Sequence, residues 1–219
     1  MLSTAGEGTE QADLLNSATG LSVGIGPNAI LQVLDLAERW YGTSTANALS
    51  AGLLPCGARP QSLVPEALVA QLHHRVVELL DPNEAYKLLH HAGEQTAQYL
   101  LAHRIPKPAQ WLMKKMPRFV SGQILTAAIS RNAWTFVGSG QFSARYTRLR
   151  TKPAQRGWCY RIASNPLAKG LNQKTVACWF YTAVFQTLFQ VLVHPAIRVV
   201  ETQCMARGDA YCEFEFRKV

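Results

Sequence analysis

Apolar residues recur three and four positions apart through the first part of the chain, a pattern that predicts amphipathic helices. The predicted segments are 28–41, 64–80, 82–103 and, after Pro117, the remainder of 111–131. The third segment carries the strongest start signal. Asp81 suits its N-cap, Pro82 its first turn and Glu84 the third position of a capping box.

Beyond residue 131 the apolar period shortens, and aromatic and β-branched residues form short runs between glycine- and proline-containing turns. The predicted strands are 134–137, 142–149, 158–163, 197–201 and 211–216. One long apolar helix, 175–193, interrupts them. The order favours an α+β fold, in which N-terminal helices pack on a four- to five-stranded antiparallel sheet with a central apolar helix.

The domain organisation is expected to be simple. Residues 1–26 are rich in Gly, Ser and Thr and predict a flexible tail, which leaves 27–219 as a single ligand-binding domain. Segment 175–193 approaches the length of a membrane span, but Gln186 and Gln190 lie one helical turn apart in it. A buried helix is therefore favoured, and no membrane span is expected.

Charge is distributed very unevenly. The net charge is +8, yet residues 1–100 carry 4 basic and 10 acidic side chains, whereas the stretch 104–174 carries 14 basic side chains and no carboxylate. A segment of one sign indicates an anionic partner. The alternative is a solubilising surface that the acidic N-terminal half balances.

The five cysteines suggest metal chemistry. The first 27 residues contain acidic but no basic side chains, so no secretory signal is expected and the compartment is read as the reducing cytoplasm. Cys204 and Cys212 flank a turn near Gly208 and would lie opposite each other, while Cys178 and Glu201 could complete four ligands. Residues three apart in a strand face opposite sides, so Glu201 and Cys204 can share a site only if the strand ends or bulges between them. Buried small hydrophobes, or a Cys204–Cys212 disulfide, are the alternatives.

The C-terminal run VVETQCMARGDAYCEFEF resembles the closing signature of the 4-vinyl reductase domain family. The similarity extends upstream through Asn165-Pro166 and Cys178 and covers roughly residues 85–219. It implies a fold shared with Golgi-transport and nitric-oxide-sensing domains, in which helices and a four-stranded antiparallel sheet enclose an apolar pocket. The resemblance also implies that Cys178, Glu201, Cys204 and Cys212 bind a structural zinc ion.

Stand-alone members of this size are associated with bacteriochlorophyll synthesis in photosynthetic bacteria. The resemblance therefore implies binding or carriage of a magnesium tetrapyrrole such as divinyl protochlorophyllide. Expected partners are the enzymes of that synthesis and a second copy of the chain, in the cytoplasm or peripherally at the photosynthetic membrane. Nucleic acid is the weakest option for the basic segment, and none is expected as a partner.

Catalysis is less favoured than binding. A vinyl reductase needs a hydride source, and the segment Gly24 to Ala29 matches the G-x-G-x-x-A pattern of NADPH-binding loops. Its context is poor, because only a short strand can precede it and Pro27 removes an amide. The preferred hypothesis is a carrier. An NADPH-dependent 8-vinyl (4-vinyl) reductase and a stand-alone sensor of a small aromatic molecule remain alternatives.

Candidate ligand-binding residues come from the basic, aromatic segment. Aromatic rings could stack on a macrocycle, and arginines could bind its carboxylates. The stacking candidates are Trp111, Trp134, Phe136, Trp158 and Tyr160. The carboxylate candidates are Arg131, Arg145, Arg148 and Arg161. The candidate ligands for a central magnesium are His73, His74, His90, His91, His103 and His194. Ordinary core or surface roles are the alternative for all of them.

Overall fold

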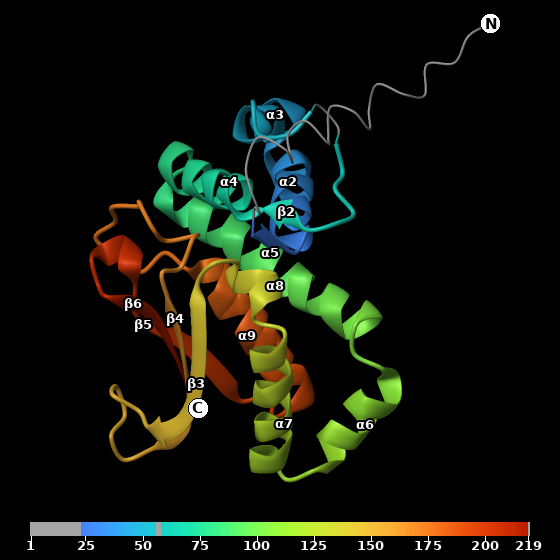
Figure 1. The fold of residues 1–219 in the computed structure, drawn as a ribbon, viewed down its shortest axis with the longest axis vertical. Helices are drawn as coiled ribbons and strands as arrows, with labels where there is room; N and C mark the ends of the chain where they lie inside the picture. The colour runs from blue at the N-terminus through green and yellow to red at the C-terminus, as the bar shows by residue number, and fades with distance from the viewer. Residues whose placement is uncertain (1–22, 56–57, 219) are drawn as a thin grey trace, which may run out of the picture.

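Helices and one antiparallel sheet share the core of the protein (Figure 1). The computed structural model describes residues 23–55 and 58–218. In chain order the elements are β1 (Gly24–Ile25), α2 (Asn28–Tyr41), α3 (Thr43–Ser50), β2 (Val64–Pro65), α4 (Glu66–Leu79), α5 (Pro82–His103), α6 (Lys107–Lys115), α7 (Arg118–Arg131), α8 (Trp134–Val137), β3 (Gln141–Arg148), β4 (Arg156–Ala163), α9 (Trp179–Leu192), β5 (Ile197–Gln203), the 3-10 helix η1 (Met205–Arg207) and β6 (Tyr211–Lys218). The predicted α+β class is confirmed.

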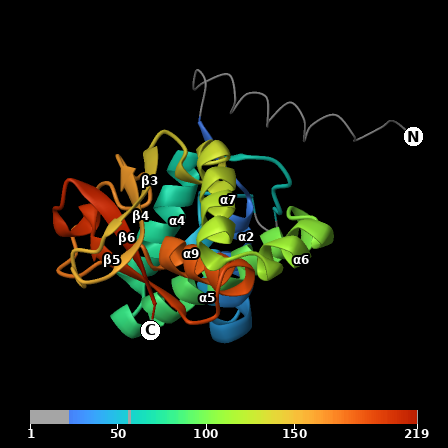
Figure 2. The ribbon, with the colours of Figure 1, turned by 90° about the horizontal axis from the view of Figure 1, so that it is seen from below.

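The four-stranded sheet has the order β3-β4-β6-β5, with all neighbours antiparallel. Alternate residues therefore face opposite sides. On the inner side, Tyr160 pairs with Phe214 and Tyr146 with Trp158, and these rings pack on α9 and α7. Helices α7 and α9 lie together beside this sheet when the molecule is viewed from below (Figure 2).

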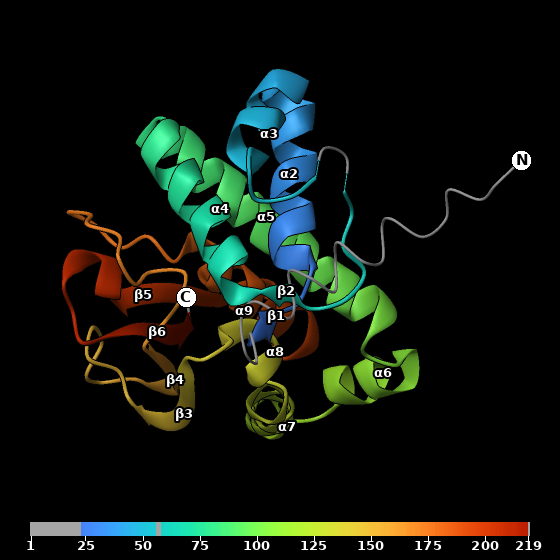
Figure 3. The ribbon, with the colours of Figure 1, turned by 45° about the horizontal axis from the view of Figure 1, so that its top comes forward.

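Helix α9 is the centre of the core, as its apolar sequence predicts. Phe180, Phe185 and Phe189 are all buried, and the last two contact the sheet through Phe214 and Phe216. The N-terminal helices gather at one end of the molecule, where α5 crosses between α9 and the α2–α4 group (Figure 3). The arrangement leaves one face of the sheet in contact with helices and the other without them.

The predicted start of α5 is confirmed in part. Asp81 is the N-cap, and its side chain accepts a hydrogen bond from the Asn83 amide at 2.9 Å. Glu84 does not close a capping box. Its carboxylate accepts hydrogen bonds from the Tyr41 hydroxyl at 2.7 Å and from Lys87 at 2.8 Å, because a tertiary contact with α2 competes for it.

The prediction of a strand at 134–137 is wrong. Residues Trp134–Val137 form the short helix α8, in which the amides of Phe136 and Val137 donate to the carbonyl of Ala133. Aromatic and β-branched residues favour strands only when a neighbouring strand is available to pair. Here the chain leaves α7, turns at Gly138 with φ 56° and only then enters the sheet.

Three boundaries also differ from the sequence-based ones. The central helix begins at Trp179 rather than 175, which places Cys178 at its N-cap, and α6 begins already at Lys107. The short pair β1–β2 begins inside the expected tail of 1–26, since Gly24–Ile25 pairs with Val64–Pro65. Residues 1–22 of that tail lie outside the described residues. Among the described residues, no helix has the length and apolar character that crossing a membrane requires.

Candidate metal centre

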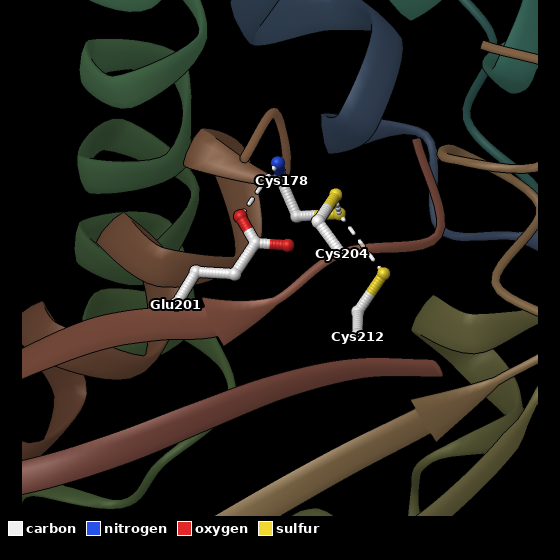
Figure 4. A group of neighbouring side chains, drawn as sticks. All are labelled: Cys178, Glu201, Cys204 and Cys212. Carbon is white, nitrogen blue, oxygen red and sulfur yellow. Dashed lines mark hydrogen bonds between the residues drawn. The ribbon is translucent and has the colours of Figure 1, made fainter. Parts of the chain in front are cut away.

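Three thiols and one carboxylate meet between α9 and the ends of β5 and β6 (Figure 4). The Cys178 sulfur lies 3.7 Å from that of Cys204 and 3.4 Å from that of Cys212. One ligand atom from each of the four residues, Glu201 included, lies within 4.8 Å of every other. All four side chains are buried, so the cluster is closed to solvent.

Backbone irregularities bring these residues together. The β5–β6 register shifts between Glu201 and Gln203, and β5 ends at Gln203. This bulge and strand end let Glu201 and Cys204 face the same site although they are three residues apart. The turn that follows is held by Asp209, which accepts a hydrogen bond from the Cys204 amide at 2.8 Å. Gly208 adopts φ 91°, a left-handed conformation that glycine tolerates.

Asn165 forms a second layer around the sulfurs that the sequence interpretation did not assign. It is fully buried, and its Nδ2 donates to the sulfurs of Cys178 and Cys212, both at 3.3 Å. The Met205 amide also donates to Cys212 at 3.4 Å. Donors of this kind stabilise negative sulfur. The Asn165-Pro166 pair belonged to the matching segment, but its spacing alone did not reveal a contact with the cysteines.

The electrostatics of the cluster suit a cation. Burial raises the pKa of Glu201 well above its usual range, and its Oε1 is buried without a hydrogen-bond partner, while Oε2 accepts from the Cys178 amide at 2.9 Å. Hydrogen bonds from Cys178 and Cys204 lower the pKa of Cys212 to about 4, and sharing its proton with these sulfurs raises that of Cys178. A divalent ion would satisfy both the orphaned oxygen and the thiolates.

The donor set matches tetrahedral zinc in kind and in spacing. Zinc binds thiolate at about 2.3 Å, so two sulfurs on one tetrahedral ion lie about 3.8 Å apart. The two sulfur separations at Cys178 are close to this value. Four donors would fill the coordination sphere, which is typical of structural sites, whereas catalytic sites keep a position open. The described cysteines, which are Cys159 and the three of the cluster, are free thiols rather than disulfides.

The residues predicted to bind a ligand are not gathered in one pocket. Trp158 and Tyr160 are buried on the inner face of the sheet, where the Tyr160 hydroxyl lies 2.8 Å from that of Thr126. Phe136 is partly buried near Phe142 and Tyr181. The other stacking candidates and two arginines are exposed: Trp111 on α6, Arg131 on α7, Trp134 on α8 and Arg148 on β3.

Arg145 and Arg161 lie on the outer face of the sheet. Both contact the buried carboxylate of Glu213, Arg161 at 2.6 Å and Arg145 at 3.8 Å. Strand alternation explains the separation, because residues 159 and 161 face the side opposite to 158 and 160. These two arginines therefore balance a buried acid and cannot share a ligand with Trp158 on the inner face.

One aromatic hollow lies between the start of α7 and the end of the sheet. It has a volume of about 80 Å³, and its lining includes Phe119, Tyr146, Trp158 and His194, with Arg118, Arg156 and Lys218 among its basic groups. Trp158 Nε1 is buried without a hydrogen-bond partner. His194 Nδ1 accepts from the Ala196 amide at 3.1 Å, so the neutral ring carries its proton on Nε2.

The glycine segment near the N-terminus is not in the context of a dinucleotide-binding loop. Strand β1 spans two residues and pairs antiparallel with β2 rather than leading into a βαβ unit. The Gly26 amide already donates to the carbonyl of Thr135 at 2.8 Å. A pyrophosphate would therefore find neither the amide nor the helix entry that such loops supply.

Comparison with known proteins is consistent with this site. The model of the 4-vinyl reductase domain family matches residues 158–218, which include all four residues of the cysteine cluster. The chain is 39% identical over 192 residues to the bacteriochlorophyll synthase 23 kDa chain of Cereibacter sphaeroides, covering 87% of this chain and 89% of that one. It is 34% identical to the Rhodobacter capsulatus protein of the same name, covering 87% and 85%.

Solved structures with the same fold are more distant in sequence. An H-NOX protein from K. algicida superposes with a TM-score of 0.54 at 11% identity, covering 89% of this chain and 97% of that one. The phenol-responsive sensory domain of the transcription activator PoxR superposes with a TM-score of 0.51 at 12% identity, covering 72% and 78%. At such identities the likeness concerns the fold. The identity to the two 23 kDa chains extends over most of both proteins, and the chain therefore belongs to the 4-vinyl reductase domain family, of which these bacteriochlorophyll synthase 23 kDa chains are members.

Proposed function

We propose that this protein binds a tetrapyrrole intermediate of bacteriochlorophyll biosynthesis and passes it to or from an enzyme of that synthesis. The observation that carries the proposal is the 39% identity over 87% of the chain to a protein named as a chain of bacteriochlorophyll synthase. Extensive similarity of this kind supports the same biosynthetic role. It also supports an association with the synthesis enzymes as the natural context of the protein.

The hollow at Trp158 is the best candidate for the pigment. Phe119 and Tyr146 contact each other at 5.0 Å between ring centroids, and Tyr146 contacts Trp158 at the same separation, which gives apolar faces for a macrocycle. The basic groups at its rim suit propionate carboxylates. Pockets for small molecules usually measure about 300–1,000 Å³. The hollow is smaller, so pigment binding requires α7 to move away from the sheet.

We also propose that Cys178, Glu201, Cys204 and Cys212 bind Zn²⁺ as a structural ion. Three of these residues lie around one hairpin and the fourth at the start of α9. The ion would therefore tie the last two strands to the central helix. Its role in this proposal is mechanical, because four protein ligands leave no position for a substrate.

Titration with protochlorophyllide tests the carrier proposal. Wild-type protein is expected to shift the pigment's absorption spectrum without loss of the vinyl group when NADPH is added. Arg156→Gln is expected to weaken binding about tenfold, since a hydrogen bond to a charged group contributes roughly 1.5–3 kcal/mol. Arg145→Gln, which removes the same charge from the outer face of the sheet, is the matched control and should bind normally.

The same titration can reject the proposal. Absence of a spectral shift with wild-type protein would exclude tetrapyrrole binding, and NADPH-dependent loss of the vinyl group would establish a reductase instead. Equal weakening in Arg156→Gln and Arg145→Gln would remove the Trp158 hollow as the binding site.

Asn165→Asp tests the second layer of the metal site. The carboxylate keeps the size of the side chain and an acceptor for the Leu167 amide, but it places negative oxygen where Nδ2 now donates to sulfur. Zinc affinity is expected to fall about 10- to 100-fold, the usual effect of losing such a partner. Competition with a zinc-binding dye measures it. Asn172→Asp, an exposed site with the same charge change, should leave the affinity unchanged, and an unchanged affinity in Asn165→Asp would refute this role.

A further inference from the structure

The α6–α7 elbow, defined as residues 107–131, exposes apolar side chains to an unusual degree. Among the described residues, twelve large apolar side chains are exposed, and five of them fall within the fourteen positions 111–124. These five are Trp111, Leu112, Phe119, Val120 and Ile124. Trp111 is 64% exposed, although tryptophan is usually well buried. Clustered exposure of this kind marks an interaction surface.

The exposed residues are not needed to hold the elbow in place. Its inner side packs through Met113 and Leu125, and Gln110 Nε2 donates to the carbonyl of Ile105 at 2.8 Å. The Ser121 hydroxyl donates to the carbonyl of Met113 at 2.6 Å and ties the two helices together. Gly122 sits directly against the Trp158 ring and allows close approach to the sheet. Each helix therefore has a complete buried side as well as a second, outward apolar side.

The outward residues form stripes at helical spacing. On α6, positions 108, 111, 112 and 115 share one side, and on α7, positions 120, 124, 127, 128 and 131 do so. The elbow itself projects at the edge of the molecule, with α6 well separated from β5 and β6 (Figures 1 and 3). A surface that projects in this way can meet a broad, flat partner.

The charge around these stripes has one sign. The exposed basic residues of the elbow and its approach are Arg104, Lys107, Lys114, Lys115, Arg118 and Arg131. No Asp or Glu occurs between Glu94 and Glu201, and in the described part of the chain no ion pair involves any of these six side chains. Their charges are thus available to an anionic partner.

We infer that the α6–α7 elbow docks the protein on an anionic lipid bilayer surface. Helices that lie in the interface of a membrane combine lysine and arginine with tryptophan, phenylalanine and leucine, as this elbow does. Tryptophan prefers the level of the lipid headgroups, and nearby lysines can extend toward phosphates while their stems cover apolar surface. An acidic protein would satisfy the charge, but the projecting stripe of large apolar residues fits the acyl boundary of a bilayer better. The inference concerns a surface distinct from the Trp158 hollow and does not depend on pigment binding.

Co-sedimentation of the purified full chain with vesicles tests this inference. The protein is expected to bind vesicles of phosphatidylglycerol mixed with phosphatidylcholine, and to bind pure phosphatidylcholine at least tenfold less. Lys114→Gln/Lys115→Gln should weaken binding by roughly tenfold or more, since each basic residue near an anionic surface contributes about fivefold. Trp111→Ser/Leu112→Ser should weaken it similarly through lost apolar contact.

Matched variants separate the elbow from general charge and hydrophobicity. Lys169→Gln/Lys174→Gln removes two exposed positive charges after β4, and Leu79→Ser removes an exposed leucine at the end of α4. Both are expected to bind vesicles as the wild type does. Circular dichroism melting confirms that every variant is folded, and pigment titration without vesicles should be unaffected by the elbow substitutions at 111 and 112.

Three results would overturn the inference. The first is absence of wild-type binding to phosphatidylglycerol vesicles, and the second is equal loss of binding in the elbow and control variants. The third is a concentration-dependent dimer, seen by sedimentation velocity, that Trp111→Ser/Leu112→Ser dissociates while vesicle binding is absent. That result would assign the elbow to a second copy of the chain.

Discussion

Cys204→Ser is expected to abolish stoichiometric zinc binding and to destabilise the fold by about 3 kcal/mol or more, because loss of a metal ranks among the most destabilising single changes. For a chain of this size, 1 kcal/mol shifts the midpoint of thermal unfolding by about 2–4 °C, so the midpoint should fall by about 6–12 °C. The buried Oε1 of Glu201 and the remaining sulfurs would lose the ion that satisfies them. Metal analysis of purified protein together with calorimetry measures both effects.

Cys159→Ser is the matched control for this experiment. Cys159 is also a buried free thiol, but it lies on the outer face of the sheet next to Glu213, away from the cluster. Its substitution should leave the zinc content at one ion per chain. If wild type and Cys204→Ser prove equally free of zinc after expression in zinc-supplemented medium, the metal proposal fails and the cluster is a group of buried thiols.

Gly93→Val is expected to destabilise the protein by about 3 kcal/mol, because α5 and α9 are too close together at this point for a larger side chain. A Cβ atom at position 93 would lie 2.3 Å from the carbonyl oxygen of Phe180 and 2.8 Å from the Cβ of Ala183. Both atoms belong to the central helix, and the nearer one is backbone, so no side-chain rotation can relieve the overlap. Urea denaturation measures the loss.

Gly93→Ala gives this prediction a clear sign. Helix propensity alone would make the alanine variant about 1 kcal/mol more stable, whereas the overlap with Phe180 requires it to be less stable. Gln98→Ala, at an exposed position of the same helix, should have little effect. A stabilised Gly93→Ala variant would show that α5 and α9 have room to separate, contrary to the packing described above.

The fold class could be read from the sequence because its signals are local. Asp81 and Pro82 mark the start of α5, and alternation of apolar residues marks β3, β4, β5 and β6. The short helix α8 could not be read in this way. Its residues favour a strand, and only the absence of a pairing partner at that point of the chain makes them helical.

The cysteine cluster shows the same division. The sequence supplied the four residue types and their resemblance to a zinc-binding set, and it identified the need for a bulge between Glu201 and Cys204. The structure has that irregularity in β5. Asn165 could not have been assigned, because its contacts with Cys178 and Cys212 join residues that are 13 and 47 positions apart.

The sequence by itself determined the helical and strand segments, the acid-free basic stretch and the identity of the cluster residues, since each depends on residue type and spacing. Only the tertiary structure decided where the basic stretch points. It places Arg161 on a buried glutamate, Arg156 beside an aromatic hollow and Lys114 on a projecting elbow. The physical reason is that charge along a chain carries no direction until strand alternation and helix packing assign each side chain to a face.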